Sequence, residues 1–418
     1  MTAREVALKT LYMIEKDGAY CDKALKKQLN NDMAKEDINL ITNIVYGVTD
    51  KRRRLDYIIE NYSTQKLNKI SVWIKNILRM GIYQILFMDK IPPSAAVNES
   101  VKLAKRYGHG ASAGFVNAIL RNIIRNGDVT YPKDNISIFY SVPDWMTDLF
   151  VSQYGLENTI KIFDAFSKVS PTTIRVNRIK TTTDVLKARL ENAGIKVKNT
   201  DYDDILEISD FGDIGKLKEY KEGLFTPQDV SAYLTGTTLN PEKNDFIIDV
   251  CAAPGGKTTH LAEIINNDGT IIAFDLYPHK VDIIESNCKR LGITCVDAKV
   301  WDSMKVNEEY IGKADKVLAD VPCSGLGVIG KKSDIKWHRT PEDLKEIIKM
   351  QDIILENASK YLKHGGELVY STCTINKQEN EEVVNRFIEK SNFKITEEKT
   401  IMPYDGSDGF YICKMTKE

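Results

Sequence analysis

The feature that most constrains this chain is a regular alternation of strand-like and helix-like segments after residue 245. Helix-like segments follow Gly256 and cover residues 279–291 and 341–362. The predicted strands are residues 246–250, 270–275, 298–300, 316–320 and 367–371. Strands that alternate with helices form parallel sheets covered by helices on both faces. The sequence therefore predicts a doubly wound, Rossmann-like α/β domain over residues 241–418.

The N-terminal part has a different pattern. Residues 1–130 contain four apolar stripes at helical spacing, within residues 6–14, 38–48, 77–86 and 115–124, and are predicted to form an all-α domain. They carry 21 Lys and Arg against 13 Asp and Glu, a surplus of +8, whereas the rest of the chain has a balance of −9. A basic module suits a polyanion, but Lys-rich solvated helix faces would give the same count. The basic group at residues 51–54 leaves the same two interpretations open, phosphate contact or a helix end.

The middle of the chain is predicted to be a small α+β subdomain. Residues 172–177 and 195–198 have the pattern of strands, and residues 183–193 that of a helix ended by Gly194. We therefore expect three domains, and their predicted bounds are residues 1–130, 131–240 and 241–418.

Composition excludes several classes of protein. The longest apolar run, around residues 82–88, is far too short to cross a bilayer, and the first residues have no secretory signal. The seven cysteines form no CxxC pair, and the five histidines complete no zinc-ligand spacing. We expect a cytoplasmic protein with reduced thiols, no membrane association and no metal.

A cofactor site is predicted where the first strand of the α/β domain ends. The strand leads into the sequence CAAPGGKT at residues 251–258 and then into a helix, which is the ligand-binding geometry of doubly wound sheets. Asp275, at the end of the next strand, is placed to accept hydrogen bonds from the hydroxyls of a ribose. Asp302 follows the next strand and is placed to bind an adenine amino group, with Asp297 as a second candidate.

These residues favour an adenosine cofactor without a triphosphate, such as S-adenosylmethionine. A P-loop needs a glycine where this chain has Cys251, and it would leave Asp275 unexplained. The dinucleotide fingerprint Gly-x-Gly-x-x-Gly is also absent, which disfavours nicotinamide.

Two cysteines follow strand ends that should open onto the same crevice. Asp320 and Cys323 come after one predicted strand, and Cys373 comes after the next. Thiols, a carboxylate and a methyl donor together suit methylation of a pyrimidine at C5. A thiolate adds to C6 and makes C5 nucleophilic, a carboxylate accommodates charge at N3 and N4, and a second thiol assists release. Lys257 can bridge Asp320 and the base.

The same residues resemble a known family. The segments at 249–258, 320–323 and 371–374 are similar to the signature motifs of RNA (cytosine-5) methyltransferases, and residues 175–177, 225–229 and 380–381 resemble its other motifs. The first 127 residues resemble the NusB-like helical domain. The combination resembles bacterial methyltransferases of small-subunit ribosomal RNA, and the resemblance covers essentially the whole chain.

The resemblance implies transfer of a methyl group from S-adenosylmethionine to C5 of a cytosine in 16S ribosomal RNA, by a protein expected to be monomeric. It implies Cys373 as nucleophile and Cys323 as the release-assisting thiol, although the residues alone leave this order open, since Pro322-Cys323 also resembles the nucleophile dipeptide of DNA cytosine methyltransferases. The expected catalytic residues are Cys373, Cys323, Asp320 and Lys257. The expected cofactor-binding residues are Cys251, Ala252, Ala253, Pro254, Gly255, Gly256, Lys257, Asp275, Asp302 and Asp320.

Other segments of the chain also bear on RNA binding. The loop at residues 330–339 interleaves cations with Trp337 and is predicted to hold phosphates and stack a base. Arg175 and Asn177 could contact RNA or support Asp320.

The rival functions are a P-loop-like ATPase or kinase and a non-catalytic RNA-binding factor built on the basic helical domain. The first conflicts with Cys251, and the second leaves both strand-end cysteines without a purpose.

Overall fold

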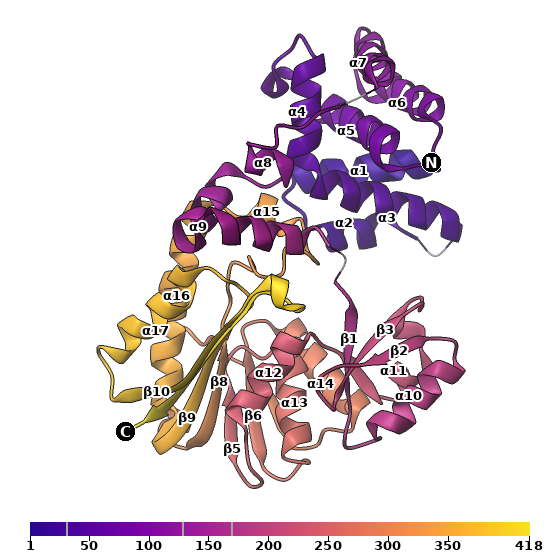
Figure 1. The fold of residues 1–418 in the computed structure, drawn as a ribbon. Helices are drawn as coiled ribbons and strands as arrows, with labels where there is room; N and C mark the ends of the chain where they lie inside the picture. Colours follow the sequence, from indigo (N-terminus) through magenta and orange to yellow (C-terminus); the bar gives the residue numbers. More distant parts are fainter. Residues whose placement is uncertain (31, 128, 169) are drawn as a thin grey trace. The chain divides into compact units, whose positions relative to one another are not determined.

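The computed structural model describes residues 1–30, 32–127, 129–168 and 170–418, which form two compact units (Figure 1). The first, called here the helical unit, consists of Met1–Ser167 together with Lys332–Arg339. The second, called the sheet unit, consists of Lys168–Lys331 and Thr340–Glu418. The chain therefore passes from one unit to the other at three places along the sequence.

The helical unit confirms the all-α prediction. The four apolar stripes lie on α1, α3, α5 and α7, whose buried side chains form one core. Helices α2, α4 and α6 were not predicted from the sequence, because they combine few core residues with many charged or small ones. The helices of this unit are α1 (Ala3–Lys16), α2 (Cys21–Gln28), α3 (Lys35–Asp50), α4 (Arg52–Tyr62), α5 (Val72–Phe87), α6 (Pro93–Tyr107), α7 (Ser112–Asn126), α8 (Ile136–Phe139), α9 (Asp144–Phe166) and α15 (Ile335–His338), with the 3-10 turn η1 (Leu67–Lys69).

The segment Lys332–Arg339 packs on the ends of two helices of the helical unit. The Asp334 carboxylate accepts a hydrogen bond of 2.7 Å from the backbone N–H of Cys21, at the start of α2. At the end of α3, Lys336 donates to the Asp50 carboxylate at 3.0 Å, and the Trp337 indole donates to the Thr49 carbonyl at 2.7 Å. The prediction that this loop holds RNA is therefore corrected for Lys336 and Trp337, whose polar groups cap protein helices instead.

The basic group at residues 51–54 is also engaged within the helical unit. Arg53 forms an ion pair of 2.6 Å with Asp144, and Arg54 donates to the Phe139 carbonyl. The Arg52 guanidinium lies 5.2 Å from the centroid of the Trp337 ring, within cation–π range. Of the two interpretations of this group, the structure favours the structural one.

The sheet unit begins with a small antiparallel sheet of strand order β2-β3-β1-β4. Its core combines apolar residues of these strands with Leu186 and Leu190 of α10. This arrangement confirms the α+β prediction, and β3 and β4 complete a sheet of which the sequence indicated only two strands. The elements are β1 (Thr172–Val176), α10 (Thr183–Asn192), β2 (Lys196–Asn199), β3 (Ile205–Ser209), η2 (Ile214–Lys216), α11 (Lys218–Lys221) and β4 (Phe225–Pro227).

Within the described residues, seven strands form the larger sheet, in the order β10-β11-β9-β8-β5-β6-β7. The five strands from β9 to β7 are parallel, as predicted, whereas β10 and β11 are antiparallel additions at one edge. The elements are α12 (Val230–Leu239), β5 (Phe246–Asp249), α13 (Gly256–Ile264), β6 (Thr270–Asp275), α14 (Pro278–Leu291), β7 (Val296–Val300), η3 (Glu308–Tyr310), β8 (Ala314–Asp320), α16 (Pro341–Lys360), β9 (Leu362–Thr372), η4 (Lys377–Glu379), α17 (Glu381–Ile388), β10 (Phe393–Ile401), η5 (Pro403–Asp405) and β11 (Phe410–Lys417).

Helices cover both faces of the larger sheet. Neighbouring strand residues belong to different cores, as Ile247 and Ile248 of β5 show, because successive side chains of a strand point to opposite faces. One core includes side chains of α16 and α17, and the other includes side chains of α12, α13 and α14. The fold is thus the doubly wound arrangement predicted, and its ligand side is the edge where β5, β6, β8 and β9 end.

Candidate active site

The glycine-bearing turn opens α13 at the carboxyl end of β5. Gly255 has a φ of +94°, a conformation that side-chain-bearing residues rarely adopt, so glycine is required there. A Cβ built on Gly256 would meet no atom of the described residues within 4 Å. The backbone is therefore open at the start of α13, and this open backbone suits the close approach of a cofactor.

Asp275 and Asp302 lie at the same edge of the sheet. Asp275 is buried at the end of β6, and its carboxylate accepts hydrogen bonds from the backbone N–H groups of Ala253 and Tyr277, at 3.2 and 3.4 Å. Asp302 follows the end of β7, and its carboxylate accepts from the Met304 N–H at 3.0 Å. Asp275 therefore fixes the glycine-bearing turn from the β6 side.

Arg175 supports the same turn from the opposite side. Its guanidinium donates to both oxygens of Glu263, each at 2.9 Å, and to the Gly256 carbonyl at 2.8 Å. Both side chains are almost fully buried. Neither of the expected roles for this arginine, RNA contact or support of Asp320, matches these contacts, and Asn177 likewise bonds backbone carbonyls, those of Gly223 and Leu291.

Lys257 and Asp320 form an ion pair at the carboxyl ends of β5 and β8. The Lys257 ammonium lies 2.7 Å from one Asp320 oxygen, and the Ser371 hydroxyl donates to the other at 2.8 Å. Burial alone would lower the pKa of Lys257, but the Asp320 charge raises it, so the ammonium stays protonated. The pair thus keeps a fixed positive and a fixed negative charge at the edge where ligands bind.

The two strand-end cysteines meet at this edge. The sulfur atoms of Cys323 and Cys373 are 3.1 Å apart, although the residues lie 50 positions apart in the chain, and both side chains are half-buried. A hydrogen bond to Cys373, together with burial, raises the pKa of Cys323 well above that of a free thiol. The arrangement favours a protonated Cys323 that donates to Cys373.

Asp249 ends β5 and Cys251 begins the turn, and the pKa values of both side chains are raised. Burial, with the nearby charge of Asp320, raises the pKa of Asp249 to about 7, and its carboxyl accepts from the Thr258 hydroxyl at 2.7 Å. Burial also raises the pKa of Cys251, which is therefore not a ready nucleophile.

The structure brings most of the predicted residues together at one edge of one sheet. Residues 251–257 form the turn, Asp275 bonds that turn, and Lys257 joins it to Asp320. Ser371 lies in the predicted motif at residues 371–374 but was given no role, because its bond to Asp320 follows only from the pairing of these two residues between β8 and β9. Glu379, a buried carboxylate six positions after Cys373, was not predicted, although the next two residues were noted as a motif.

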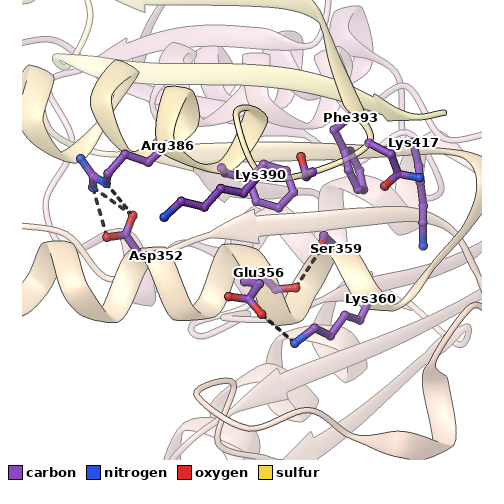
Figure 2. Close-up of a pocket in the computed structure, with 11 residues that line it drawn as sticks. Asp352, Glu356, Ser359, Lys360, Arg386, Lys390, Phe393 and Lys417 are labelled. Atoms are coloured by element: carbon purple, nitrogen blue, oxygen red, sulfur yellow. Dashed lines mark hydrogen bonds and ion pairs between the residues drawn. The ribbon is translucent and has the colours of Figure 1, made fainter.

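A separate hollow of about 430 Å³ lies elsewhere on the sheet unit, between α16, α17, β10 and β11 (Figure 2). Phe393 and Lys417, which pair at the start of β10 and the end of β11, line it. Lys417 also donates to the carbonyl of Leu362, at the start of β9. The hollow therefore lies at the opposite end of the strands from the cysteines and is distinct from the candidate active site.

The described residues include no helix that is long and apolar enough to span a membrane. They also include no group of three or more His, Cys, Asp and Glu side chains arranged to hold a metal ion.

The fold and the strand-end site together define a Rossmann-like methyltransferase with a NusB-like helical domain. Residues 236–416 match the family described as 16S rRNA methyltransferase RsmB/F, residues 1–125 match the NusB family, and residues 142–214 match the ferredoxin-like domain of RsmF/B-like methyltransferases. The chain is 34% identical to the probable ribosomal RNA small subunit methyltransferase B of Bacillus subtilis (strain 168), over 100% of this chain and 99% of that protein. The chain therefore belongs to the RsmB/F family of 16S rRNA methyltransferases, and it is an enzyme.

Other relatives agree with this assignment. The ribosomal RNA small subunit methyltransferase B of Escherichia coli O7:K1 is 30% identical over 93% of both chains. The crystal structure of PH0851 superposes with a TM-score of 0.84 at 24% identity, over 100% of this chain and 99% of that one, and shows the same fold. The structure of NSun6 from Pyrococcus horikoshii with SFG has a TM-score of 0.61 at 26% identity and covers 66% of this chain and 98% of that one.

Proposed function

We propose that this enzyme transfers a methyl group from S-adenosylmethionine to C5 of a cytosine in 16S ribosomal RNA, through a covalent bond between Cys373 and C6. The observation that carries the proposal is the 3.1 Å approach of the Cys323 and Cys373 sulfurs at the strand edge that also holds the ion pair of Lys257 and Asp320. A structural role for the thiols would not require this polar and partly open location.

The residues present suit the cofactor. The proposed binding residues are those of the turn at 251–257, with Asp275 for the ribose, Asp302 for the adenine and Asp320 beside the methyl group. Bound there, S-adenosylmethionine would supply the electrophilic methyl group. The open backbone at Gly256 and the buried Asp275 carboxylate support this assignment. The relative NSun6, solved with SFG, supports it from outside this chain.

Each side chain at the edge then has a proposed task. The Cys373 thiolate adds to C6 of the base and raises the electron density at C5, which attacks the methyl group. Asp320, held by Lys257 and Ser371, is placed to bind the N3 and N4 side of cytosine, where charge changes during addition. Water beside Cys323 then takes the C5 proton, the electron pair of the C5–H bond re-forms the C5–C6 double bond, and Cys373 leaves C6 as a thiolate, with Cys323 assisting this release.

The remaining parts are proposed to bind RNA. We keep the proposed division into residues 1–130, 131–240 and 241–418, with the first two domains positioning rRNA and the third carrying out transfer. The surplus of +8 charges in residues 1–130 supports a polyanion partner. The target base must leave its stack to reach Cys373, which favours a loop or an opened helix as the substrate. We propose that the protein acts as a monomer in the cytoplasm.

The test compares the two cysteines. Cys373→Ala should abolish methylation, and Cys323→Ala should accumulate a protein–RNA adduct on a denaturing gel, because release is blocked after transfer. Bisulfite sequencing of 16S rRNA from cells with and without the gene should identify a cytosine that loses its protection. Normal turnover by Cys373→Ala would overturn the mechanism, and unchanged bisulfite patterns would overturn the substrate.

A further inference from the structure

We infer that Glu379 is the positioning residue of the cysteine pair: it fastens the loops that carry Cys323 and Cys373 to each other, and its charge keeps the shared proton on Cys323. The inference rests on the proposed function, because it explains which of the two thiols is free to attack. It concerns a residue outside the predicted site, at the end of η4.

The Glu379 side chain is fully buried and accepts hydrogen bonds from both cysteine loops. One oxygen accepts from the Ser324 hydroxyl at 2.6 Å and the Asn376 amide at 3.0 Å. The other accepts from the Ser324 N–H at 2.7 Å and the Gln351 amide at 3.2 Å. Ser324 follows Cys323 directly, and Asn376 lies three residues after Cys373. Four donors to two oxygens suit an ionised carboxylate.

Further bonds extend this clamp to both neighbours of Cys323 and to the residue that follows Cys373. Gln351 also donates to the carbonyl of Pro322, which precedes Cys323, at 3.0 Å. The Ser324 hydroxyl lies 3.0 Å from the hydroxyl of Thr374, which follows Cys373. A displaced Glu379 would therefore release both loops together, and the 3.1 Å approach of the sulfurs depends on both.

The charges around the two thiols are unequal. The negative charges of Cys373 and Glu379 both raise the pKa of Cys323, after its hydrogen bond to Cys373 and its burial. The other thiol, Cys373, lies near Lys257. A negative charge on Cys373 raises the pKa of this lysine. Tyr370, the further titratable group that senses Cys323, is buried, which raises its pKa and keeps it neutral. A carboxylate behind Cys323 and an ammonium near Cys373 favour a thiol on the first and a thiolate on the second.

The first measurement needs no RNA. Iodoacetamide alkylation of the purified protein is followed against pH, and peptide mass spectrometry separates Cys323 from Cys373. In the wild type, Cys373 should be modified at lower pH than Cys323. In Glu379→Gln, the profile of Cys323 should shift to lower pH, and the ratio of the two rates should fall at least fivefold. An unchanged ratio would overturn the inference.

Glu381→Gln is the matched control, since it makes the same change two residues away. The Glu381 carboxylate accepts a hydrogen bond from the Thr400 hydroxyl of β10 at 3.3 Å, so its partner lies outside both cysteine loops. It should leave both alkylation profiles unchanged. Glu379→Asp separates charge from position: it should keep the order of the two thiols while the loops loosen. If Cys323 is alkylated at lower pH than Cys373 in Glu379→Asp, the charge of residue 379 does not set the order of the two thiols.

The second measurement is methyl transfer. Glu379→Gln should lower kcat at least tenfold while KM for S-adenosylmethionine stays within twofold, because the cofactor turn is not touched. The melting temperatures of Glu379→Gln and Glu381→Gln are compared to check folding. If Glu379→Gln does not fold, Glu379→Asp is measured in its place, and its kcat should fall about tenfold. Wild-type protein that transfers no methyl group to rRNA would overturn the proposed function, whereas full activity of the Glu379 variants would overturn only this inference.

Discussion

Two ion pairs meet α13, and they differ in almost every respect. Arg175 and Glu263 lie behind the helix with side chains 1% and 4% exposed, and Arg175 also holds the turn at Gly256. Lys257 and Asp320 lie at the front of the helix, 16% and 27% exposed, at the edge where the cysteines meet. The first pair is shut off from solvent, whereas the second is partly exposed to it.

The difference separates a structural pair from a reactive one. A buried pair is costly to break, because the remaining charge has neither water nor a partner. A partly open pair can lose a partner without unfolding the protein, because water can solvate the charge that remains, but its fixed charges then no longer face the substrate. We therefore expect changes at the first pair to reduce stability and changes at the second to reduce turnover.

The largest effect is expected for Asp320→Asn. The amide cannot balance Lys257 or accept the charge that develops on the base, so kcat should fall about 10²- to 10⁴-fold. The melting temperature should stay close to that of the wild type. Steady-state methylation assays and thermal melts check this, and a large loss of stability with intact kcat would remove the distinction between the pairs.

Arg175→Met should have the next largest effect, on folding. It leaves Glu263 buried without a cation, and the free energy of unfolding should fall by about 3–5 kcal/mol. Chemical denaturation measures this loss. Retention of wild-type stability would show that the pair contributes no more than a surface contact.

The same variant should respond to pH in a defined direction. Burial raises the pKa of Glu263 and Arg175 opposes that rise, so the pKa should rise further in Arg175→Met. Below its pKa the carboxyl is protonated and the uncompensated charge is gone. The stability deficit should therefore be larger at pH 8 than at pH 5, and denaturation at both pH values would contradict the charge argument if the deficits were equal.

A moderate effect is expected for a change at Asp275, which bonds the glycine-bearing turn. Asp275→Asn keeps the size of the side chain but removes the charge that attracts the Ala253 N–H and that we propose binds the ribose hydroxyls. Binding of S-adenosylmethionine should weaken about tenfold, equivalent to about 1.4 kcal/mol. Isothermal titration calorimetry measures this, and unchanged affinity would assign Asp275 to the turn alone.

The smallest effect is expected for an exposed ion pair, which serves as a reference for the two pairs of α13. Lys349 and Glu346 form an exposed ion pair of 2.7 Å on α16. Lys349→Ala should change the free energy of unfolding by less than about 0.5 kcal/mol and leave kcat unaltered. A larger loss of unfolding free energy in denaturation experiments would mean that exposure does not indicate how much an ion pair stabilises this protein.

Much of the parallel sheet could be predicted because short apolar strands such as β5 and β6 alternate with helices. The buried strand β11 was not predicted. The edge strand β10 was missed because most of its residues are exposed and it carries little apolar pattern. The segment Lys332–Arg339 was misinterpreted for a different reason: cations and an indole suit RNA, and nothing local reveals that Trp337 bonds Thr49, 288 positions earlier.

The site was predictable only in part, for a related reason. That strand ends gather at one edge follows from topology, and it places Asp320, Cys323 and Cys373 near one another. The bonds that Glu379 receives from Gln351 and Ser324 span 28 and 55 positions of sequence, so no local pattern encodes them. Register and loop packing decide such contacts, and they follow only from the folded chain.

The capping of α2 and α3 by Lys332–Arg339 has a consequence for taking the protein apart. A protease that cuts once, near residue 168, would not free the first unit, since its last piece is still supplied by the other half of the polypeptide. A shortened version ending at residue 240 would likewise lack those caps. Any transplant of the basic bundle onto another enzyme must carry this distant peptide along.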